Sequence, residues 1–391
     1  MKRKTALYGV SCFIFFVIAE VSAYIVGNIF VDMGLLYGKP TNFQGTYSEF
    51  YANYLTDRDE EFGWRIKEMP ELDYIQDKSD SRYTPAFPDP ELYKNCISIY
   101  GDSYTYSNEV DSEHAWGNVL SKLLGCRVGN FGVGGYGSDQ AYLRFLANRE
   151  DEAPIVMLNH LSENILRNVA QLRTLMASGR KFPLSPSFKP RFIVEKDGTL
   201  KKIDIPTFQP EEFESVMERP EDFLPYEYFV PGGDSGLARL TFPYSLSIFN
   251  VFRHFHFQAW LLNEPWYAPF YQEDHPSNGM QVTSAIMQAF NAEALARGKA
   301  PVLTVIPTGL SLEYFLDTGA WTYQPLLDSL VDADLDVLNY GEGIMQRLAG
   351  EDPCQLFDNC DSHFNEKGYA MIAEITYEEL QRRGLIDSQN P

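Results

Sequence analysis

Five short apolar runs, separated by stretches with helical spacing, limit the folds open to this 391-residue chain. Strands of a parallel sheet are buried on both faces, so they read as nearly continuous apolar runs. Alternation of such runs with helices is typical of α/β proteins. The sequence therefore predicts a parallel five-stranded sheet covered by helices on both faces, with strands at 96–101, 126–131, 154–158, 302–306 and 335–338.

A long stretch between the third and fourth runs breaks this alternation. It has proline-rich ends and an aromatic piece at 246–262, where Arg253 and two histidines favour a buried or interfacial helix over a second membrane span. We expect these segments in order: an N-terminal membrane anchor or signal segment at 1–31, a connector or flap at 32–92, the first part of the α/β domain at 93–171, an insertion at 172–278, and the second part of the domain at 279–391.

The N-terminus indicates the compartment. A basic tip at 2–4 precedes an apolar run that reaches residue 31 and carries one charged residue, Glu20. One helix over this run would be about 40 Å long, enough to cross a bilayer core of roughly 30 Å. The alternative is a signal peptide cleaved after 21–23. We favour an uncleaved anchor because apolar sequence continues past that site, and in either case the rest of the chain is exported to the periplasmic or extracellular face.

Composition argues against several classes of partner. The chain carries 54 acidic and 32 basic residues, a formal charge of -22, and has no basic cluster beyond its N-terminal tip. Binders of phosphate backbones need a basic face, so we expect no nucleic-acid partner. The sequence holds no Cys-x-x-Cys or His-x-x-x-His spacing, and its glycine-rich loop at 132–137 lacks the dinucleotide fingerprint. We therefore expect no metal and no cofactor.

Five cysteines fit an exported chain. Cys12 lies in the apolar run, and the other four could form two disulfides outside the cytoplasm. Cys354 and Cys360 enclose a tight loop, and we expect a bond between them. A bond between Cys96 and Cys126 requires that the two strands they open are neighbours with matched starts.

The candidate catalytic residues are a hydroxyl, an imidazole and a carboxylate. Ser103 follows the first strand in Gly-Asp-Ser, while Asp361 and His363 precede the closing helix. Ester hydrolysis or acyl transfer needs such a nucleophile, a base and an acid that orients the base. The N–H groups of Ser103 and Gly135 and the amide of Asn164 are candidate oxyanion donors. A second Gly-Asp-Ser, at 233–235, follows no apolar strand and is interpreted as a loop.

These blocks resemble the SGNH, or GDSL-type, hydrolase and acyltransferase superfamily. Gly101-Asp102-Ser103 matches its nucleophile block, Asn-x-Gly-Val-Gly-Gly at 130–135 its glycine block, and Asp-Ser-His-Phe-Asn at 361–365 its terminal block. Glu-Asn-Ile at 163–165 stands where the family usually has Gly-x-Asn-Asp. The resemblance covers roughly 93–170 and 280–386. It implies a flavodoxin-like three-layer α/β/α sandwich with an acyl-enzyme on Ser103.

Two departures from the family pattern leave roles open. The third block lacks its glycine and its aspartate, so Asn159 is an alternative to Asn164 as oxyanion donor. One residue, where the commonest pattern has two, separates Asp361 from His363. We expect Asp361, rather than Asp358, to orient the imidazole, because residues two apart in an extended segment project to the same side. The shortened block also resembles exported, membrane-tethered polysaccharide acetyl-transfer enzymes.

The expected function is a serine esterase that hydrolyses an O-acyl ester, with acetyl favoured, on an envelope or extracellular glycan. An O-acetyltransferase acting on a polysaccharide is the alternative, and an inert glycan- or lipid-binding relative is the second alternative. The presence of Ser103, Asp361 and His363 together favours an enzyme. The expected partners are an acylated small molecule or glycan as substrate and the membrane, through the N-terminal segment.

Overall fold

The computed structural model describes residues 2–40, 43–66, 73–176 and 186–387. The chain divides into two compact units, each assembled from separate segments. The first, here called the helical unit, comprises Met1–Arg58, Ala170–Lys189 and Pro206–Trp266. The second, the α/β unit, comprises Asp59–Val169, Pro190–Ile205 and Tyr267–Pro391.

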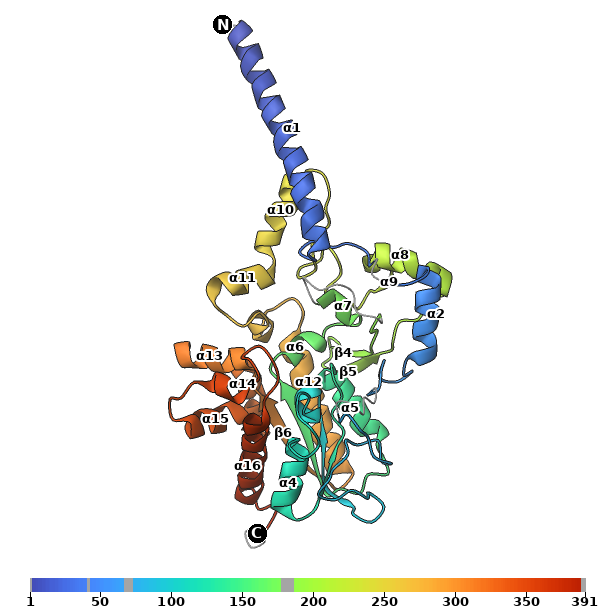
Figure 1. The fold of residues 1–391 in the computed structure, drawn as a ribbon, viewed down its shortest axis with the longest axis vertical. Coiled ribbons are helices and arrows are strands. Elements are labelled where there is room, and N and C mark those ends of the chain that lie inside the picture. Colours follow the sequence, from blue (N-terminus) through green and yellow to red (C-terminus); the bar gives the residue numbers. More distant parts are fainter. Residues whose placement is uncertain (1, 41–42, 67–72, 177–185, 388–391) are drawn as a thin grey trace. The chain divides into compact units, whose positions relative to one another are not determined.

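A parallel five-stranded sheet forms the centre of the α/β unit (Figure 1). Its order is β2-β1-β3-β6-β7, which is the flavodoxin-like order of doubly wound sheets. The prediction of five parallel strands is confirmed. The strands are β1 (Asn95–Tyr100), β2 (Arg127–Asn130), β3 (Ile155–Leu161), β6 (Ala300–Ile306) and β7 (Val337–Asn339).

Helices cover this sheet in the manner expected of a three-layer α/β/α fold. Helix α4 packs against α16, and α5 packs against α12. The strands between them are apolar and buried, with Ile97, Ile99 and Val156 fully inaccessible. The helices of the unit are α3 (Ser103–Tyr106), α4 (Trp116–Leu124), α5 (Ser138–Ala147), α6 (Asn164–Arg167), α12 (Gly279–Ala296), α13 (Gly309–Thr318), α14 (Gln324–Asp332), α15 (Tyr340–Leu348) and α16 (Glu366–Arg382), with 3-10 turns η3 (Ala268–Tyr271) and η4 (Pro353–Leu356).

An antiparallel hairpin, β4 (Arg191–Val194) with β5 (Leu200–Ile203), also belongs to the α/β unit. This hairpin was not predicted from the sequence. Its turn contains Asp197 and Gly198, the latter at φ +86°, in the left-handed region where glycine is at no disadvantage. The hairpin packs on α12 and α5, where the Phe192 ring lies 5.8 Å from that of Tyr142.

The helical unit contains a long N-terminal helix and a core of aromatic rings. In that core the rings of Tyr51 and Phe213 stack at 4.5 Å. Helix α1 is continuous through Glu20, and its stretch Tyr8–Asp32 is long and apolar enough to cross a membrane. The helices of the unit are α1 (Lys2–Asp32), α2 (Tyr47–Asp57), α7 (Arg173–Met176), α8 (Phe213–Glu218), α9 (Pro220–Phe223), α10 (Tyr244–Arg253) and α11 (Phe255–Leu262), with a 3-10 turn η2 (Pro210–Glu212).

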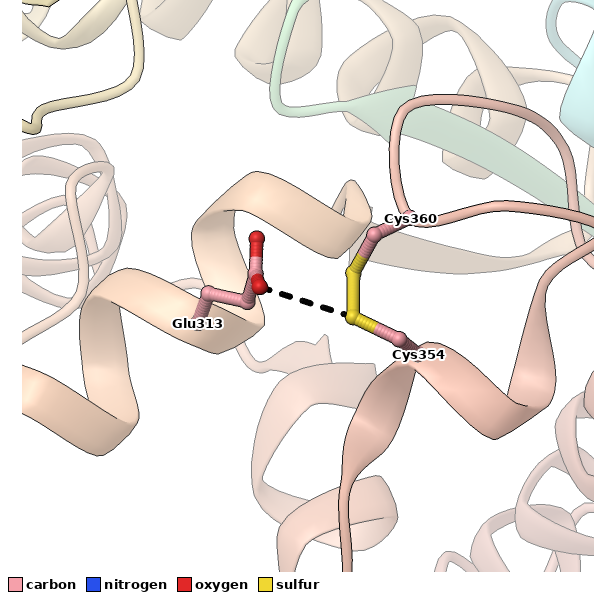
Figure 2. Close-up of side chains that lie close together, drawn as sticks. All are labelled: Glu313, Cys354 and Cys360. Atoms are coloured by element: carbon pink, nitrogen blue, oxygen red, sulfur yellow. Dashed lines mark hydrogen bonds between the residues drawn. A yellow bond between two sulfur atoms is a disulfide. The ribbon is translucent and has the colours of Figure 1, made fainter.

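The predicted Cys354–Cys360 disulfide is formed, and so is the conditional Cys96–Cys126 bond. Cys96 is bonded to Cys126, with their Cα atoms 6.1 Å apart, because β1 and β2 are neighbours whose starts are aligned. Cys354 is bonded to Cys360, with Cα atoms 4.8 Å apart. Glu313 approaches this second bond, as Figure 2 shows. Sulfurs joined in a disulfide have no thiolate to offer a metal, so this cluster is not a metal centre in its oxidised form.

Candidate active site

The predicted nucleophile lies where β1 meets the first helix after it. Strand β1 ends at Tyr100, and Asp102 then caps α3 by accepting a hydrogen bond from the Tyr104 N–H at 2.9 Å. Ser103 is the first residue of α3 and is 6% exposed. It thus stands at the carboxyl end of the strand that neighbours both β2 and β3, the switch point at which doubly wound sheets bind ligands.

His363 comes from the loop between η4 and α16 and reaches the same point. Its Nε2 atom is 2.8 Å from Ser103 Oγ, so the hydroxyl can donate its proton to the neutral imidazole. The His363 ring lies 4.9 Å from that of Tyr104, whose hydroxyl donates to the Ser362 carbonyl at 2.7 Å. The structure therefore brings together two residues that are 260 positions apart in the chain.

The acid nearest to the other imidazole nitrogen is Glu109. Its Oε1 atom is 3.5 Å from His363 Nδ1. Asp361 is exposed, and its backbone N–H donates to the Asn359 side chain. No hydrogen bond or ion pair joins Asp361 to His363 among the described residues, and Asp358 contacts His363 through the backbone alone. The role expected for Asp361 thus stays a prediction without a supporting contact, whereas Glu109 was missed by the sequence analysis.

A buried arginine fixes the turn that carries Glu109. The Arg82 guanidinium, 1% exposed, donates to the carbonyls of Tyr106, Ser107 and Val110 at 2.6, 2.7 and 2.7 Å. Glu109 itself has φ +72°, a left-handed conformation that costs energy for a residue with a side chain. Because three carbonyl contacts hold the turn, Glu109 keeps its place beside the imidazole. No sequence motif marks this left-handed turn, so the position of Glu109 could not be predicted from the sequence.

Burial and nearby charges set the protonation of the pair. Burial lowers the pKa of His363 below its usual 6.5, while the negative charges of Asp102 and Glu109 oppose this shift. The imidazole is therefore mostly neutral at pH 7 and can accept a proton. Burial raises the pKa of the Asp102 carboxyl. The Arg167 guanidinium, 3.2 Å away, opposes this shift because it favours the charged carboxylate.

The expected oxyanion donors all lie in the α/β unit. Gly135 has φ +81°, and neither its N–H nor that of Ser103 donates a hydrogen bond within the described chain. The glycine block approaches the nucleophile turn closely, because a Cβ on Gly132 would lie 2.4 Å from the Tyr106 nitrogen. Both N–H groups thus remain unpaired within the described chain, as the expected oxyanion role requires.

Asn164 begins α6, directly after β3, and is buried. Its amide lies near Asp102 and helps to lower that carboxyl's pKa, but neither amide atom meets the geometry of a hydrogen bond. Asn159 lies within β3, where its Oδ1 accepts the Thr304 hydroxyl at 2.8 Å. The Nδ2 atoms of both side chains are buried without a hydrogen-bond partner, so this comparison does not separate the two candidate donors.

Two residues that could have been mistaken for site residues have structural roles. His160 is buried with both ring nitrogens hydrogen-bonded, to Ser138 at 2.7 Å and to Tyr271 at 2.9 Å. Burial lowers its pKa to about 3, so it stays neutral. Ser235, in the second Gly-Asp-Ser, belongs to the helical unit and donates to the Tyr228 hydroxyl at 3.3 Å.

Comparison with known proteins finds similarity of fold. No protein-family model matches the sequence, and no curated protein matches it significantly. A member of the lipolytic protein G-D-S-L family from Veillonella parvula matches at 10% identity and a TM-score of 0.32, over 73% of this chain and 98% of its own. A Lactobacillus plantarum protein matches at 12% and 0.35, over 74% and 97%. An acetyl xylan esterase from Butyrivibrio proteoclasticus matches at 10% and 0.32, over 74% and 64%.

At TM-scores this low, the matches carry no inference about substrate or mechanism. The fold itself is read from the order of the sheet and from the position of the motifs on it. Gly101-Asp102-Ser103, the glycine block and Asn164 follow β1, β2 and β3, and the terminal block returns His363 to Ser103. This sheet order gives the chain a flavodoxin-like three-layer α/β/α fold, on which its four blocks resemble those of the SGNH, or GDSL-type, hydrolase superfamily.

Proposed function

We propose that this protein is a serine esterase. The observation that carries the proposal is the 2.8 Å contact between Ser103 Oγ and His363 Nε2 at the end of the central strand. A hydroxyl attacks an ester only when a base takes its proton, and a buried neutral imidazole is such a base. Glu109, at Nδ1, is the acid that we assign to orienting the ring, in the place that the sequence suggested for Asp361.

The reaction proceeds through an ester on Ser103. His363 takes the hydroxyl proton as Oγ attacks the carbonyl carbon, and the oxyanion is held by the N–H groups of Ser103 and Gly135 and by the Asn164 amide. Collapse breaks the bond to the leaving alcohol, which receives its proton from His363. Water, deprotonated by the same imidazole, then attacks the acyl carbon; the bond to Ser103 Oγ breaks, the acid is released, and His363 returns the proton to Ser103 Oγ.

The proposed substrate is an O-acyl ester, with acetyl favoured, on an envelope or extracellular glycan. Two disulfides and the apolar helix α1 support an exported chain that is anchored to the membrane. Transfer to a sugar hydroxyl would use the same acyl-enzyme and differ only in what attacks it. Free acid released in step with ester loss, in the presence of a sugar acceptor, identifies hydrolysis, whereas acylated sugar identifies transfer.

The test is to label and assay the purified full chain. A fluorophosphonate probe should modify the parent, and Ser103→Ala should abolish labelling and lower the hydrolysis of an aryl acetate by at least about 10³-fold. Ser235→Ala is the matched control, because it removes the serine of the other Gly-Asp-Ser, and it should retain both labelling and rate. Labelling of Ser103→Ala at the parental level would refute the proposal.

A further inference from the structure

A charged residue lies halfway along the apolar helix of the helical unit. Glu20 is 6% exposed, in the middle of the stretch Tyr8–Asp32. Its carboxylate accepts hydrogen bonds from the backbone N–H groups of Tyr244 and Ser245, at 2.6 and 3.4 Å, and from the Ser245 hydroxyl at 2.5 Å. Glu20 therefore caps the beginning of α10, the helix that packs beside α1 in Figure 1.

The segment before α10 runs along α1 toward its middle. Leu240 fills the space left by Gly27, where a Cβ would lie 2.2 Å from the leucine Cδ1. Further along, the ring of Phe242 is 6.3 Å from that of Phe16. Gly27 and Phe16 are separated by about 16 Å along a helix that rises about 1.5 Å per residue. The chain thus runs beside α1 toward the N-terminus of that helix, turns at Pro243, and runs back in the opposite direction as α10.

Most N–H groups of this turn are paired inside the protein. The Thr241 N–H donates to Ser247 Oγ at 3.0 Å, and the same hydroxyl donates back to the Thr241 carbonyl at 3.0 Å. Pro243 has no N–H, and the next two N–H groups are bound by Glu20. Irregular backbone within a bilayer is tolerated only where its polar groups are paired inside the protein, and three of the four N–H groups at 241–245 are paired in this way.

The side of α10 that faces away from α1 is apolar. Along α10, Leu246, Phe249 and Phe252 are 55%, 56% and 43% exposed, while Ser247 and Val251 on the opposite side are buried. Soluble surfaces seldom present such a patch without a partner. Helix α11 continues it with Trp260, Leu261 and Leu262, each more than 60% exposed.

Charge is distributed as a membrane requires. No acidic residue occurs between Asp234 and Glu264, although the chain carries 54. Two arginines mark the ends of the apolar segment. Arg239, which pairs with Glu221 at 2.7 Å, precedes it, and Arg253 ends α10. Arginine at the ends and tryptophan on the adjoining helix are the residues that favour the level of the lipid headgroups.

We infer that residues 240–253 form a re-entrant membrane element, which enters the bilayer beside α1 and leaves on the same side, with α11 at the interface. Its partner is the acyl-chain region of the lipid. The inference rests on the proposed membrane anchoring and is independent of the esterase reaction. It also makes α1 a retained part of the fold, because removal of α1 as a signal peptide would remove Glu20 and uncap α10.

The test places single cysteines in the full-length Cys12→Ser chain, reconstituted in vesicles of phosphatidylcholine and phosphatidylglycerol. Bimane on Leu246→Cys or Phe252→Cys should lose most of its fluorescence to nitroxide-labelled lipids. A mid-chain nitroxide should quench the first more strongly, and a nitroxide near the headgroup the second. Both sites should react slowly with a charged maleimide. Leu295→Cys, on the α/β unit and 59% exposed, is the control that sets the rate of an exposed cysteine, and it should react fast.

Three outcomes would overturn the inference. Labelling of Leu246→Cys as fast as of Leu295→Cys would show that the patch faces water. Protection from maleimide without lipid quenching would show that a protein surface, such as a second copy, covers it. An intact mass lacking α1 would show a cleaved signal. Aryl acetate hydrolysis measured on the same samples tests the esterase proposal separately from the membrane inference. Lipid quenching of the labels on an inactive chain would refute the esterase proposal and leave the membrane inference standing.

Discussion

At His363, two carboxylates are candidates to hold one imidazole nitrogen. Glu109 lies 3.5 Å from Nδ1, and its charge opposes the lowering of the histidine's pKa by burial. Asp361 is exposed, and its backbone N–H donates to Asn359. Glu109→Gln should lower kcat by about 10-fold or more, because the ring loses its orienting partner. Removing a negative charge also lowers the pKa of His363. Since only the neutral ring accepts a proton, the acidic limb of kcat/KM should move to lower pH.

Asp361→Asn is the matched control for that experiment. It should leave both kcat and the acidic limb near those of the parent, as measured in pH profiles with a soluble aryl acetate. The limb of the parent should itself lie below the 6.5 of a free imidazole, because burial lowers the pKa of His363. A large loss in Asp361→Asn with a parental Glu109→Gln would restore Asp361 as the orienting acid.

The oxyanion donor is a second question about single side chains. Asn164→Ala should lower kcat by about 10²–10³ with little change in KM, as loss of a side-chain donor to a transition state does. Asn159→Ala removes a side chain of the same type, which lies within β3 and whose Oδ1 accepts from Thr304, and it should stay near the parental rate. Steady-state kinetics of the two variants distinguish the assignments, and a loss confined to Asn159→Ala would reassign the donor.

Among the elements, the loop before His363 is closed by a disulfide. Cys354 and Cys360 are six positions apart, and the Cys360 carbonyl packs where a Cβ on Gly309 would lie 2.0 Å away. Replacing both cysteines by alanine should lower stability by about 2 kcal/mol and also lower kcat, because the loop sets the position of the imidazole. Thermal unfolding and aryl acetate kinetics on the same preparation measure the two effects.

The other disulfide provides the comparison. Cys96 and Cys126 are 30 positions apart and join the starts of two strands, at the end of the sheet opposite to Ser103. Their double alanine variant should lose about 4 kcal/mol of stability by the loop-entropy estimate, with kcat unchanged in the folded fraction. Equal losses of kcat in the two variants would argue against a specific role for the loop before His363.

At the scale of the whole molecule, the proposed site and the apolar helix belong to different units. Ser103, Glu109, Asn164 and His363 all lie in the α/β unit, whereas α1 lies in the helical unit. A chain lacking residues 1–32 should therefore keep its kcat for a soluble aryl acetate in detergent. It should also aggregate without detergent, because α10 loses its cap and the side packed on α1 becomes exposed. Sedimentation with and without detergent, beside kinetics, checks both expectations.

The same chain carrying Leu92→Ser is a control for general surface hydrophobicity, because Leu92 is 69% exposed and lies in the α/β unit. That substitution should not prevent aggregation of the truncated chain. A truncated chain that stays monomeric without detergent would contradict the assignment of α10 to the membrane.

Local patterns in the sequence determined the strands, the long apolar helix and the two residues in closest contact at the proposed site. The five runs are buried because helices cover both faces, so apolar composition alone located them. Ser103 and His363 were predicted because each lies in a short motif, Gly-Asp-Ser at the end of a strand and Asp-Ser-His-Phe-Asn in a loop. The disulfides followed from cysteine spacing and from the expected positions of the strands.

Only the tertiary structure decided which distant groups meet. Glu109 reaches His363 because Arg82 holds a left-handed turn, and Glu20 reaches Tyr244 because two segments more than 200 residues apart pack together. The β4–β5 hairpin had a turn signal at Asp197 and Gly198, but its packing on α12 is again a long-range contact. Periodicity records which face of a segment is buried. It does not identify the segment that packs on that face, because many other surfaces could pack there equally well.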